Sequence, residues 1–309
     1  DGDHLVAEVG PSVGRQRHCL RNRFVATKVC YLHFCFDVVI VSVQLTKGGL
    51  MGELTGRVAA ITGGTRGIGR AIAEAFLAEG CKVVINGTNA DKGAQALAEI
   101  GRPDDVLFVK GDAKVREDCE RVVDQAVEHF GRIDIMVNNA GGATNHAPVA
   151  QLTDEALDDA LKWNLWSTFW CSRKAVNYMI PQGWGRIINI SSVEGKCGKP
   201  GLSIYVIAKH AINGLTKSMA QEVGTLGITV NSLCPGVIET DIVKEQGPQA
   251  AEAMGITYEQ LIEYFVEESS TKRVMEVDDV AAVAMLLASE AGAGITGSLI
   301  SIDGGTAPY

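Results

Sequence analysis

Two side chains four positions apart, Tyr205 and Lys209, have the chemical types that proton transfer requires. They fall on a helix that the apolar spacing predicts from Ser203 to Glu222, where residues i and i+4 share a face. A phenol with an ordinary pKa of about 10 is a poor proton donor and acceptor at neutral pH. A neighbouring ammonium stabilises the phenolate and lowers that pKa, so the pair predicts an acid/base centre.

Three glycines follow a predicted strand, Val58–Ile61, and open a predicted helix, Ile68–Glu79. Gly63 permits a tight turn, Gly67 lets the backbone approach a pyrophosphate, and Gly69 allows the helix to pack closely on the strand. The helix N-terminus supplies N–H donors to phosphate. This arrangement indicates a dinucleotide site, and the alternative is a structural turn that needs glycine for its backbone angles.

The elements that must position these groups alternate between short β-branched runs and longer helical patterns from residue 57 onward. One such helical stretch is Val115–Phe130, whose apolar residues recur at helical spacing. Apolar strands joined by helical crossovers predict a parallel sheet covered on both faces. We therefore expect an α/β fold, a doubly wound parallel sheet (Rossmann-like) in a single domain of about seven strands, with the ligand at their carboxyl ends. The predicted strands are Val58–Ile61, Lys82–Asn86, Val106–Val109, Ile133–Val137, Arg186–Ile190, Ile228–Asn231 and Ser298–Ile302.

The composition limits the class of partner. The chain has 309 residues, of which 46% are hydrophobic, and a formal charge of -9. Duplex nucleic acid and anionic membranes favour basic surfaces, so neither is expected as the main partner, and a small molecule fits better. The eight cysteines show no C-x-x-C pair and no regular spacing, which predicts neither a metal site nor a disulfide framework. We expect reduced thiols and a cytoplasmic protein.

Residues 1–50 differ in composition from the rest of the chain. Four arginines between positions 15 and 23 precede an apolar run, Val29–Val43. This run is too short and too polar for a membrane span, which needs about 20 apolar residues, and no secretory cleavage pattern accompanies it. We expect an N-terminal extension outside the core, an upstream artefact in the simplest interpretation. An organelle transit leader and an ordered functional element are the alternatives, and residues 51–309 form the expected domain.

The glycines have the spacing G-x-x-x-G-x-G, which resembles the short-chain dehydrogenase/reductase family. Further landmarks occur in the family's order, and the resemblance covers essentially all of residues 51–309. The chain is similar to the 3-oxoacyl-carrier-protein reductase-like members, and this implies an NAD(P)-dependent oxidoreductase acting on CH–OH groups. The landmarks are Asn138-Asn139-Ala140-Gly141, Asn164, Ser192, Tyr205-x-x-x-Lys209 and Pro235-Gly236.

The resemblance implies a catalytic set of Asn164, Ser192, Tyr205 and Lys209. In the family mechanism the tyrosine donates a proton to the carbonyl oxygen while the nicotinamide delivers hydride to carbon. Ser192 would polarise that oxygen, Asn164 would hold a proton-relaying water, and Lys209 would also bind the nicotinamide ribose. Taken singly, each residue has a structural alternative: a turn cap, a helix amide, a packing aromatic or a solvated charge. Ser191 competes with Ser192, but the thirteen-residue offset to Tyr205 selects Ser192.

The family pattern also implies the cofactor contacts. Asp112 matches the position that binds the adenine, whereas Ile238 and Thr240 match contacts to the nicotinamide carboxamide. After the second strand, 86–89 reads Asn-Gly-Thr-Asn, with no carboxylate for a ribose 2'-hydroxyl, and Arg66 could bind a 2'-phosphate. We favour NADP(H) over NAD(H), although a second basic residue after this strand is absent and Arg66 could simply be solvated. The predicted cofactor set is Gly63, Thr65, Arg66, Gly67, Ile68, Gly69, Asp112, Asn138, Ala140, Gly141, Tyr205, Lys209, Pro235, Gly236, Ile238 and Thr240.

The stretch from Asp241 to Arg273 precedes the next predicted helix. Its apolar residues at broken helical spacing resemble the mobile substrate lid of the family, and a surface helical hairpin is the alternative. Trp163, Trp166 and Trp170 form a stripe at helical spacing, which favours core or a subunit interface. Members of the family usually pair their fourth and fifth helices across a two-fold axis, so we expect a homotetramer or a homodimer.

Three functions remain open. The favoured one is reduction of a 3-oxoacyl thioester or a related ketone. The alternatives are an NAD-dependent alcohol or hydroxy-acid dehydrogenase and, more remotely, a dinucleotide-binding sensor without turnover, against which the intact Tyr205 and Lys209 argue. One departure from the family pattern is Ile207, where a small residue is usual and a bulkier one could shift the helix that carries Tyr205.

Overall fold

Seven parallel strands form one sheet in the computed structural model of this chain. The structure describes residues 52–253 and 255–307, so the expectation for residues 1–50 lies outside the described part. The strands are β1 (Val58–Ile61), β2 (Lys82–Gly87), β3 (Val106–Lys110), β4 (Ile135–Asn138), β5 (Gly185–Ile190), β6 (Ile228–Pro235) and β7 (Leu299–Ile302). Their spatial order is β3-β2-β1-β4-β5-β6-β7, which reverses between β1 and β4. The predicted doubly wound α/β class is confirmed.

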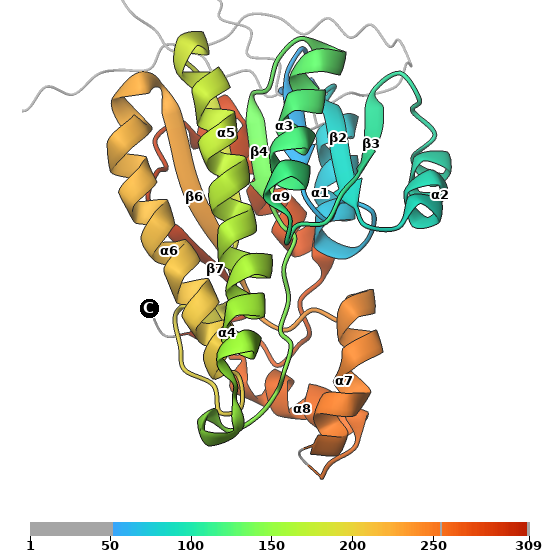
Figure 1. Ribbon diagram of the computed structural model, residues 1–309, viewed down its shortest axis with the longest axis vertical. Coiled ribbons are helices and arrows are strands. Elements are labelled where there is room, and N and C mark those ends of the chain that lie inside the picture. Colours follow the sequence, from blue (N-terminus) through green and yellow to red (C-terminus); the bar gives the residue numbers. More distant parts are fainter. Residues whose placement is uncertain (1–51, 254, 308–309) are drawn as a thin grey trace, which may run out of the picture. The chain divides into compact units, whose positions relative to one another are not determined.

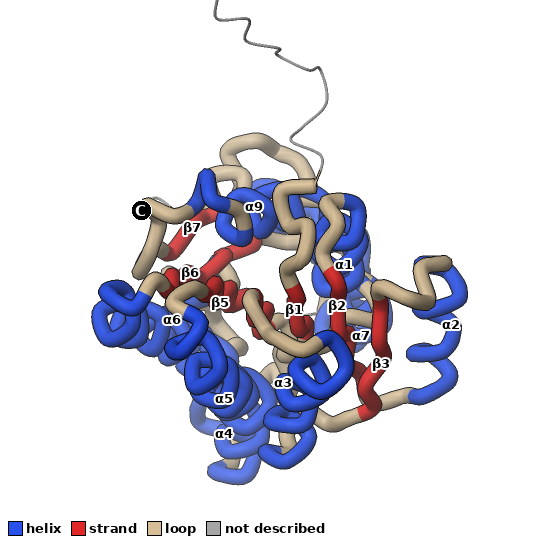
Figure 2. The backbone as a smooth tube through the Cα atoms, turned by 90° about the horizontal axis from the view of Figure 1, so that it is seen from above, coloured by secondary structure: helices blue, strands red, loops and turns tan. Residues whose placement is uncertain are grey.

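Helices connect the strands and cover both faces of the sheet (Figures 1 and 2). They are α1 (Gly67–Ala78), α2 (Ala90–Ile100), α3 (Arg116–Phe130), α4 (Asp154–Leu161), α5 (Ser167–Gln182), α6 (Ser203–Val223) and α9 (Val277–Ala288). On one face α1 packs beside α9, and on the other α5 lies between α3 and α6. The sheet is therefore covered on both sides, as its largely apolar strands require.

Successive residues of a strand point to opposite faces, and in β1 they enter two separate cores. Ala59 and Ile61 pack in one core with Phe76 of α1. Val58 and Ala60 pack in the other core, with residues of α3 and α5. All four β1 residues are buried, so the turn that follows this strand starts from a fixed position.

Two strands differ from their predicted limits by two residues or more at one end, and the others by one residue at most. The strand expected from Ile133 begins at Ile135, because the buried Asp134 uses its carboxylate to accept from the Val58 N–H and from Arg132. The strand expected to end at Asn231 continues to Pro235, because its last four residues pair with β7. Neither change moves a strand to another place in the sheet.

The segment after β6 forms two helices, α7 (Asp241–Ala253) and α8 (Tyr258–Glu268), which pack on each other and lie below the sheet in Figure 1. α8 starts with a capping box, in which Thr257 Oγ1 accepts from the Gln260 N–H and Gln260 Oε1 accepts from the Thr257 N–H. The stretch expected as a lid from Asp241 to Arg273 thus has the form of a helical hairpin, and its function as a lid stays a prediction.

Candidate active site

A cleft of about 940 Å³ opens at the carboxyl ends of the strands, on both sides of the point where the strand order reverses. A ligand site at this position is the general rule for doubly wound sheets. Two members of the predicted cofactor set, Gly69 and Asn138, do not line the cleft. The members that do line it are Gly63, Thr65, Arg66, Gly67, Ile68, Asp112, Ala140, Gly141, Tyr205, Lys209, Pro235, Gly236, Ile238 and Thr240.

The turn after β1 leaves the start of α1 open toward the cleft. Gly63 has a φ of +63°, a left-handed conformation that favours glycine. α1 then begins at Gly67, with no side-chain cap from Arg66 and no acidic residue in its first turn. The first N–H groups of a helix lack partners within the helix, so these donors can bind phosphate. The residues present therefore fit the pyrophosphate of a dinucleotide.

Replacing Gly69 with alanine is expected to destabilise this turn. A Cβ at Gly69 would lie 2.5 Å from Asn139 Nδ2 and 2.6 Å from the Gly63 carbonyl oxygen. Asn139 cannot move away freely, because its Nδ2 donates to the carbonyl oxygens of Thr62 and Gly63. We expect a loss of about 1–3 kcal/mol in the free energy of unfolding, measured by urea denaturation. Gly214→Ala is the control, since a Cβ there meets nothing within 4 Å; an equal loss in both variants would contradict the steric argument.

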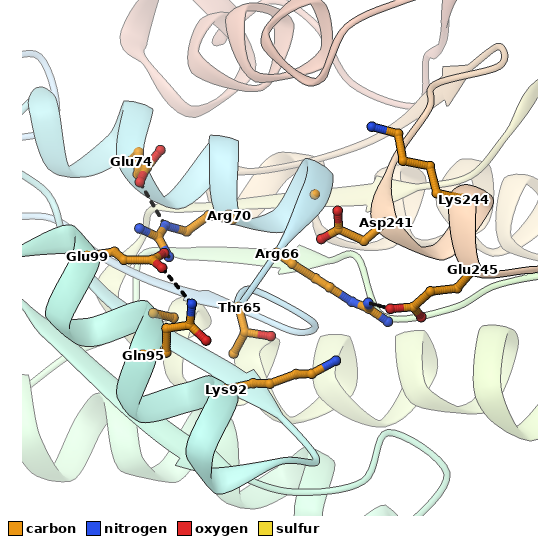
Figure 3. Close-up of a pocket in the computed structure, with 12 residues that line it drawn as sticks. Thr65, Arg66, Arg70, Glu74, Lys92, Gln95, Glu99, Asp241, Lys244 and Glu245 are labelled. Carbon is orange, nitrogen blue, oxygen red and sulfur yellow. Dashed lines mark hydrogen bonds and ion pairs between the residues drawn. The ribbon is translucent and has the colours of Figure 1, made fainter.

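A smaller pocket of about 670 Å³ adjoins the glycine turn (Figure 3). Arg66 from the turn and Lys92 from α2 both extend into it, and Glu245 of α7 pairs with Arg66 at an Nη1–Oε1 distance of 2.6 Å. Lys92 also lines the larger cleft. It supplies a second basic group that was not recognised after β2, because it lies within the first turn of α2 rather than at the strand end.

The polar residues at the end of β2 make hydrogen bonds to backbone groups of the fold. Asn86 is buried and donates to the carbonyl oxygens of Val109 and Gly111. Asn89 caps α2 by accepting from the Lys92 N–H. As the sequence indicated, this strand end carries no carboxylate that could accept from a ribose 2'-hydroxyl.

The turn after β4 brings Asn139 to the cleft and turns Asn138 away from it. Asn138 is buried, and its Nδ2 donates to Ser172 Oγ and Asn189 Oδ1. Consecutive residues at a strand end point in opposite directions, so only one of the two asparagines can face the ligand. The side chain of Asn138 therefore stabilises the strand ends behind the cleft, which corrects its expected place among the cofactor contacts.

Tyr205 and Lys209 both reach the cleft from α6. Lys209 Nζ lies 5.4 Å from the centre of the Tyr205 ring. The same Nζ donates to the carbonyl oxygen of Ile190, at the end of β5, over 2.9 Å. Tyr205 is half-buried and Lys209 is 3% exposed. The strand end thus holds the amino group next to the phenol.

Two adjacent serines follow β5 and have different partners. Ser191 Oγ donates to the carbonyl oxygen of Lys209, 3.3 Å away, and so faces the backbone of α6. Ser192 Oγ donates to the carboxylate of Glu194 and accepts from the Glu194 N–H. Both serines line the cleft, together with Glu194. Sequence reasoning missed Glu194, because no spacing rule marks it and only its contact with Ser192 identifies it.

The pKa values of the pair differ from the expectation that Lys209 lowers the pKa of Tyr205. Burial raises the pKa of Tyr205, the Glu194 carboxylate raises it further, and the Ser192 hydroxyl lowers it. Burial also lowers the pKa of Lys209 to about 8, against the opposing effects of Cys234 and Glu194. Desolvation is the largest cause of both shifts. The phenol is accordingly protonated at neutral pH, the form that can donate to a carbonyl oxygen.

Asn164 lies in a π-helical turn, Lys162–Trp166, between α4 and α5. It is fully buried, and its Oδ1 accepts from the Gly142 N–H while its Nδ2 donates to the carbonyl oxygens of Gly142 and Ala160. A π turn holds one more residue than an α turn and often marks a functional site. Here it directs the amide to the loop after β4, which it fixes at the edge of the cleft. The water relay from Asn164 stays a prediction.

α8 contributes a charged and aromatic cluster to the cleft. Lys199, in the loop before α6, forms an ion pair with Glu268. Its Nζ lies 4.6 Å from the ring centre of Tyr264 and 4.7 Å from that of Phe265. All four side chains line the cleft. The ion pair and the cation–aromatic contacts together stabilise α8 against the loop, as the contact of Glu245 does for α7.

One large apolar side chain on α6 and another just before α5 are exposed. Ile207 is 48% exposed, so its bulk does not enter the core and does not displace the helix that carries Tyr205. Trp166 is 45% exposed and stacks on Trp170, with ring centres 5.8 Å apart. Trp163, the third member of the predicted stripe, lines the cleft instead.

A family model described as short chain dehydrogenase matches residues 57–251, a segment that contains the glycine turn and all four candidate catalytic residues. The chain belongs to the short-chain dehydrogenase/reductase family. As a member of this family it is an NAD(P)-dependent oxidoreductase that acts on CH–OH groups.

Relatives and solved structures agree with this assignment. The chain is 40% identical over 253 residues to a D-beta-hydroxybutyrate dehydrogenase of Rhizobium meliloti, covering 81% of this chain and 98% of that protein. It is 37% identical over 265 residues to a 3beta-hydroxysteroid dehydrogenase of Eggerthella lenta, covering 83% and 96%. Among solved structures, an actinorhodin polyketide ketoreductase with NADPH has a TM-score of 0.78 at 28% identity, covering 84% of this chain and all of that one. These short-chain dehydrogenases and reductases differ in the substrates that their names state.

Proposed function

We propose that this enzyme reduces a 3-oxoacyl thioester or a related ketone and prefers NADP(H). The observation that carries the proposal is a single cleft with two chemically different ends. Arg66 and Lys92 also line the smaller pocket next to the glycine turn, where the ribose is expected, whereas Tyr205 lies with Ser192 and Lys209. Apolar side chains of α7 and α8, such as Val243 and Leu261, line the same cleft. The name of the polyketide ketoreductase supports a ketone substrate, and its NADPH supports the cofactor.

In the proposed mechanism Tyr205, Ser192 and Lys209 act on the substrate oxygen and its proton, and Asn164 positions the loop beside them. When bound, the nicotinamide supplies hydride to the carbonyl carbon or takes it from the alcohol. Tyr205 donates its phenolic proton to the oxygen as that atom gains negative charge, and Ser192 stabilises the same charge by hydrogen bonding. Lys209 then favours the phenolate that remains, and Asn164 keeps the loop after β4 in place. Oxidation of an alcohol uses the same groups in reverse.

The preference for NADP(H) rests on the charges around the smaller pocket. Arg66 and Lys92 point into the same space next to the end of β2, which carries no carboxylate. A guanidinium and an ammonium together match the geometry and charge of a phosphate. Glu245 pairs with Arg66, so a 2'-phosphate would have to displace this carboxylate.

We propose the segment from Asp241 to Arg273 as the lid over the substrate. Both of its helices line the cleft. Each is attached by an ion pair between side chains that are partly exposed, Arg66–Glu245 and Lys199–Glu268. Such pairs contribute little to stability and exchange readily with water, so they suit an element that opens and closes.

A second candidate is an NAD-dependent hydroxy-acid or alcohol dehydrogenase. The 40% identity to a D-beta-hydroxybutyrate dehydrogenase favours it. A third possibility, a dinucleotide-binding sensor without turnover, has no comparable support, because a pure binding protein would not need Tyr205 and Lys209 in contact with one cleft.

For assembly and location we propose a homotetramer or a homodimer in the cytoplasm. The exposed Trp166 and its stacked neighbour Trp170 support a subunit contact, because aromatic side chains are enriched at interfaces. The cysteines of the described residues are unpaired, which supports a reducing compartment. Among the described helices, none has both the length and the apolar character to span a membrane.

Initial rates with a panel of ketones, each with NADPH and NADH, test the proposed function. We expect a 3-oxoacyl thioester or a related ketone to be reduced, with a kcat/KM for NADPH at least about tenfold above that for NADH. Equal or better use of NADH would contradict the cofactor preference. Turnover confined to hydroxy acids with NAD would favour the second candidate instead.

The two directions of reaction should depend on pH in opposite ways. Alcohol oxidation needs the phenolate of Tyr205, whose pKa is raised by burial and by Glu194. Its rate should therefore rise as the pH increases above neutral, whereas ketone reduction, which needs the protonated phenol, should not rise. Initial rates between about pH 6 and about pH 10 measure both profiles. An oxidation rate that falls above neutral pH would contradict the assignment of Tyr205 as the titrating group.

A further inference from the structure

One carboxylate at the reacting end of the cleft has no part in the proposed mechanism. Glu194 is half-buried, lines the cleft and accepts a hydrogen bond from Ser192. Within residues 52–253 and 255–307, no lysine, arginine or histidine forms an ion pair with Glu194 under a 4.0 Å criterion. Its negative charge is therefore not neutralised by a direct contact.

The other charged groups at this end do not compensate for Glu194. Lys199 is already paired with Glu268 and lies against two aromatic rings. His146 also lines the cleft, where it is exposed, and partial desolvation lowers the pKa of its imidazole. Lys209 donates to a backbone carbonyl oxygen beneath the phenol. Lys209 has no ion pair among the described residues, but it is 3% exposed and lies beneath the phenol, whereas the half-buried Glu194 carboxylate faces an anion that enters this end.

We infer that Glu194 is a specificity-determining residue, which disfavours substrates with a carboxylate close to the reacting carbon and admits their neutral esters, thioesters and ketones. The inference rests on the proposed function, because it takes Ser192 to bind the substrate oxygen. Ser192 contacts Glu194 directly, so the carboxylate lies about two hydrogen-bond lengths, roughly 5–6 Å, from that oxygen. The carboxylate of a 3-oxo acid is attached two carbons from the carbon that bears that oxygen, and two like charges within roughly 8 Å in a partly buried site change binding by about tenfold or more.

The remaining walls of this end fit a neutral substrate. They include the apolar side chains of Val193, Leu202, Val237, Leu261 and Phe265. An ionised carboxylate placed among such groups would lose its hydration without gaining a partner. Glu194 therefore distinguishes the two candidate functions, since a hydroxy acid carries the charge that it repels and a 3-oxoacyl thioester does not.

A pair of substrates that share one ketone and differ in charge tests the inference. Acetoacetate and methyl acetoacetate present the same ketone, and kcat/KM for each is measured with NADPH and with NADH in the wild-type enzyme and in Glu194→Gln. We expect the wild-type enzyme to favour the ester by at least about tenfold, and Glu194→Gln to reduce this preference at least about tenfold by improving acetoacetate. Glutamine keeps the shape and the contact with Ser192 and removes the charge.

Two further variants separate charge from local structure. Glu194→Asp keeps the carboxylate and should retain the preference for the ester. Glu267→Gln, on the outer side of α8 where its side chain is 75% exposed, should leave the preference unchanged. The acid and the ester differ in the reactivity of their ketones. This difference cancels when each variant is described by the ratio of its kcat/KM for the ester to its kcat/KM for the acid.

The inference would be overturned if the wild-type kcat/KM for acetoacetate equalled that for the ester. It would also be overturned if the ratio of these two values were the same in Glu194→Gln as in the wild-type enzyme. The dissociation constant of each substrate from the enzyme–NADPH complex, measured by nicotinamide fluorescence, gives the same ratio. This measurement does not require turnover and decides the question independently. Failure of every ketone to react, whatever its charge, would count against the proposed function alone.

Discussion

Tyr205→Phe is expected to lower kcat by about a thousandfold while the dissociation constant for NADPH changes by less than about threefold. The substitution removes only the hydroxyl, which is the group that donates to the substrate oxygen. The ring stays on α6 at its distance of 5.4 Å from Lys209 Nζ. Single-turnover rates and a fluorescence titration with NADPH measure the two effects separately.

A tyrosine outside the cleft provides a matched control for the loss of a phenolic hydroxyl. Tyr178→Phe removes a hydroxyl that donates to Asp124, on α5 and away from the cleft, and should leave kcat within about twofold. Wild-type-like turnover in Tyr205→Phe would refute the proposed acid. A parallel loss of NADPH binding would show that the hydroxyl also serves cofactor binding and does not act in proton transfer alone.

The double variant Arg66→Ala/Lys92→Ala is expected to raise the KM for NADPH by about a hundredfold and to change the KM for NADH by less than about threefold. Each removed cation takes away a charge-assisted hydrogen bond to the 2'-phosphate, worth about 1.5 kcal/mol or more. NADH has no phosphate at that position, so it loses nothing comparable. Steady-state rates with each cofactor at saturating ketone provide the measurement.

Arg70→Ala is the control for this cofactor prediction. Arg70 lines the same pocket but is paired with Glu74 and Glu99, so its charge is already neutralised and its removal should affect the two cofactors equally. Glu245→Gln gives a result of opposite sign, since it frees Arg66 and should lower the KM for NADPH. Equal losses for NADPH and NADH in the double variant would contradict the phosphate site.

The parts of the site that depend on local periodicity could be predicted from the sequence. Helical spacing alone brings Tyr205 and Lys209 to one face, and the glycine turn alone defines the open start of α1. The doubly wound parallel sheet followed from apolar strands that alternate with helices. These features need only a few neighbouring residues to specify them.

The parts that depend on contacts between distant segments could not be predicted. The pKa directions of Tyr205 and Lys209 reverse the simple pairwise expectation, because burial acts on both groups and depends on the whole fold. Glu194 became recognisable only through its hydrogen bond, and Lys92 only through its approach to Arg66 in space. Asn138 was misplaced because the strand end, and not the motif, decides which asparagine faces the cleft.

The π-helical turn at Lys162–Trp166 makes the length of this segment as important as its residue types. Removing one residue from the turn would let the helix from α4 to α5 become regular, and every residue before the deletion would rotate by about 100° relative to those after it. The amide of Asn164 would then no longer reach both backbone groups of Gly142. Insertions and deletions, more than substitutions, are therefore the changes that this stretch of the chain cannot accept without opening the loop beside the cleft.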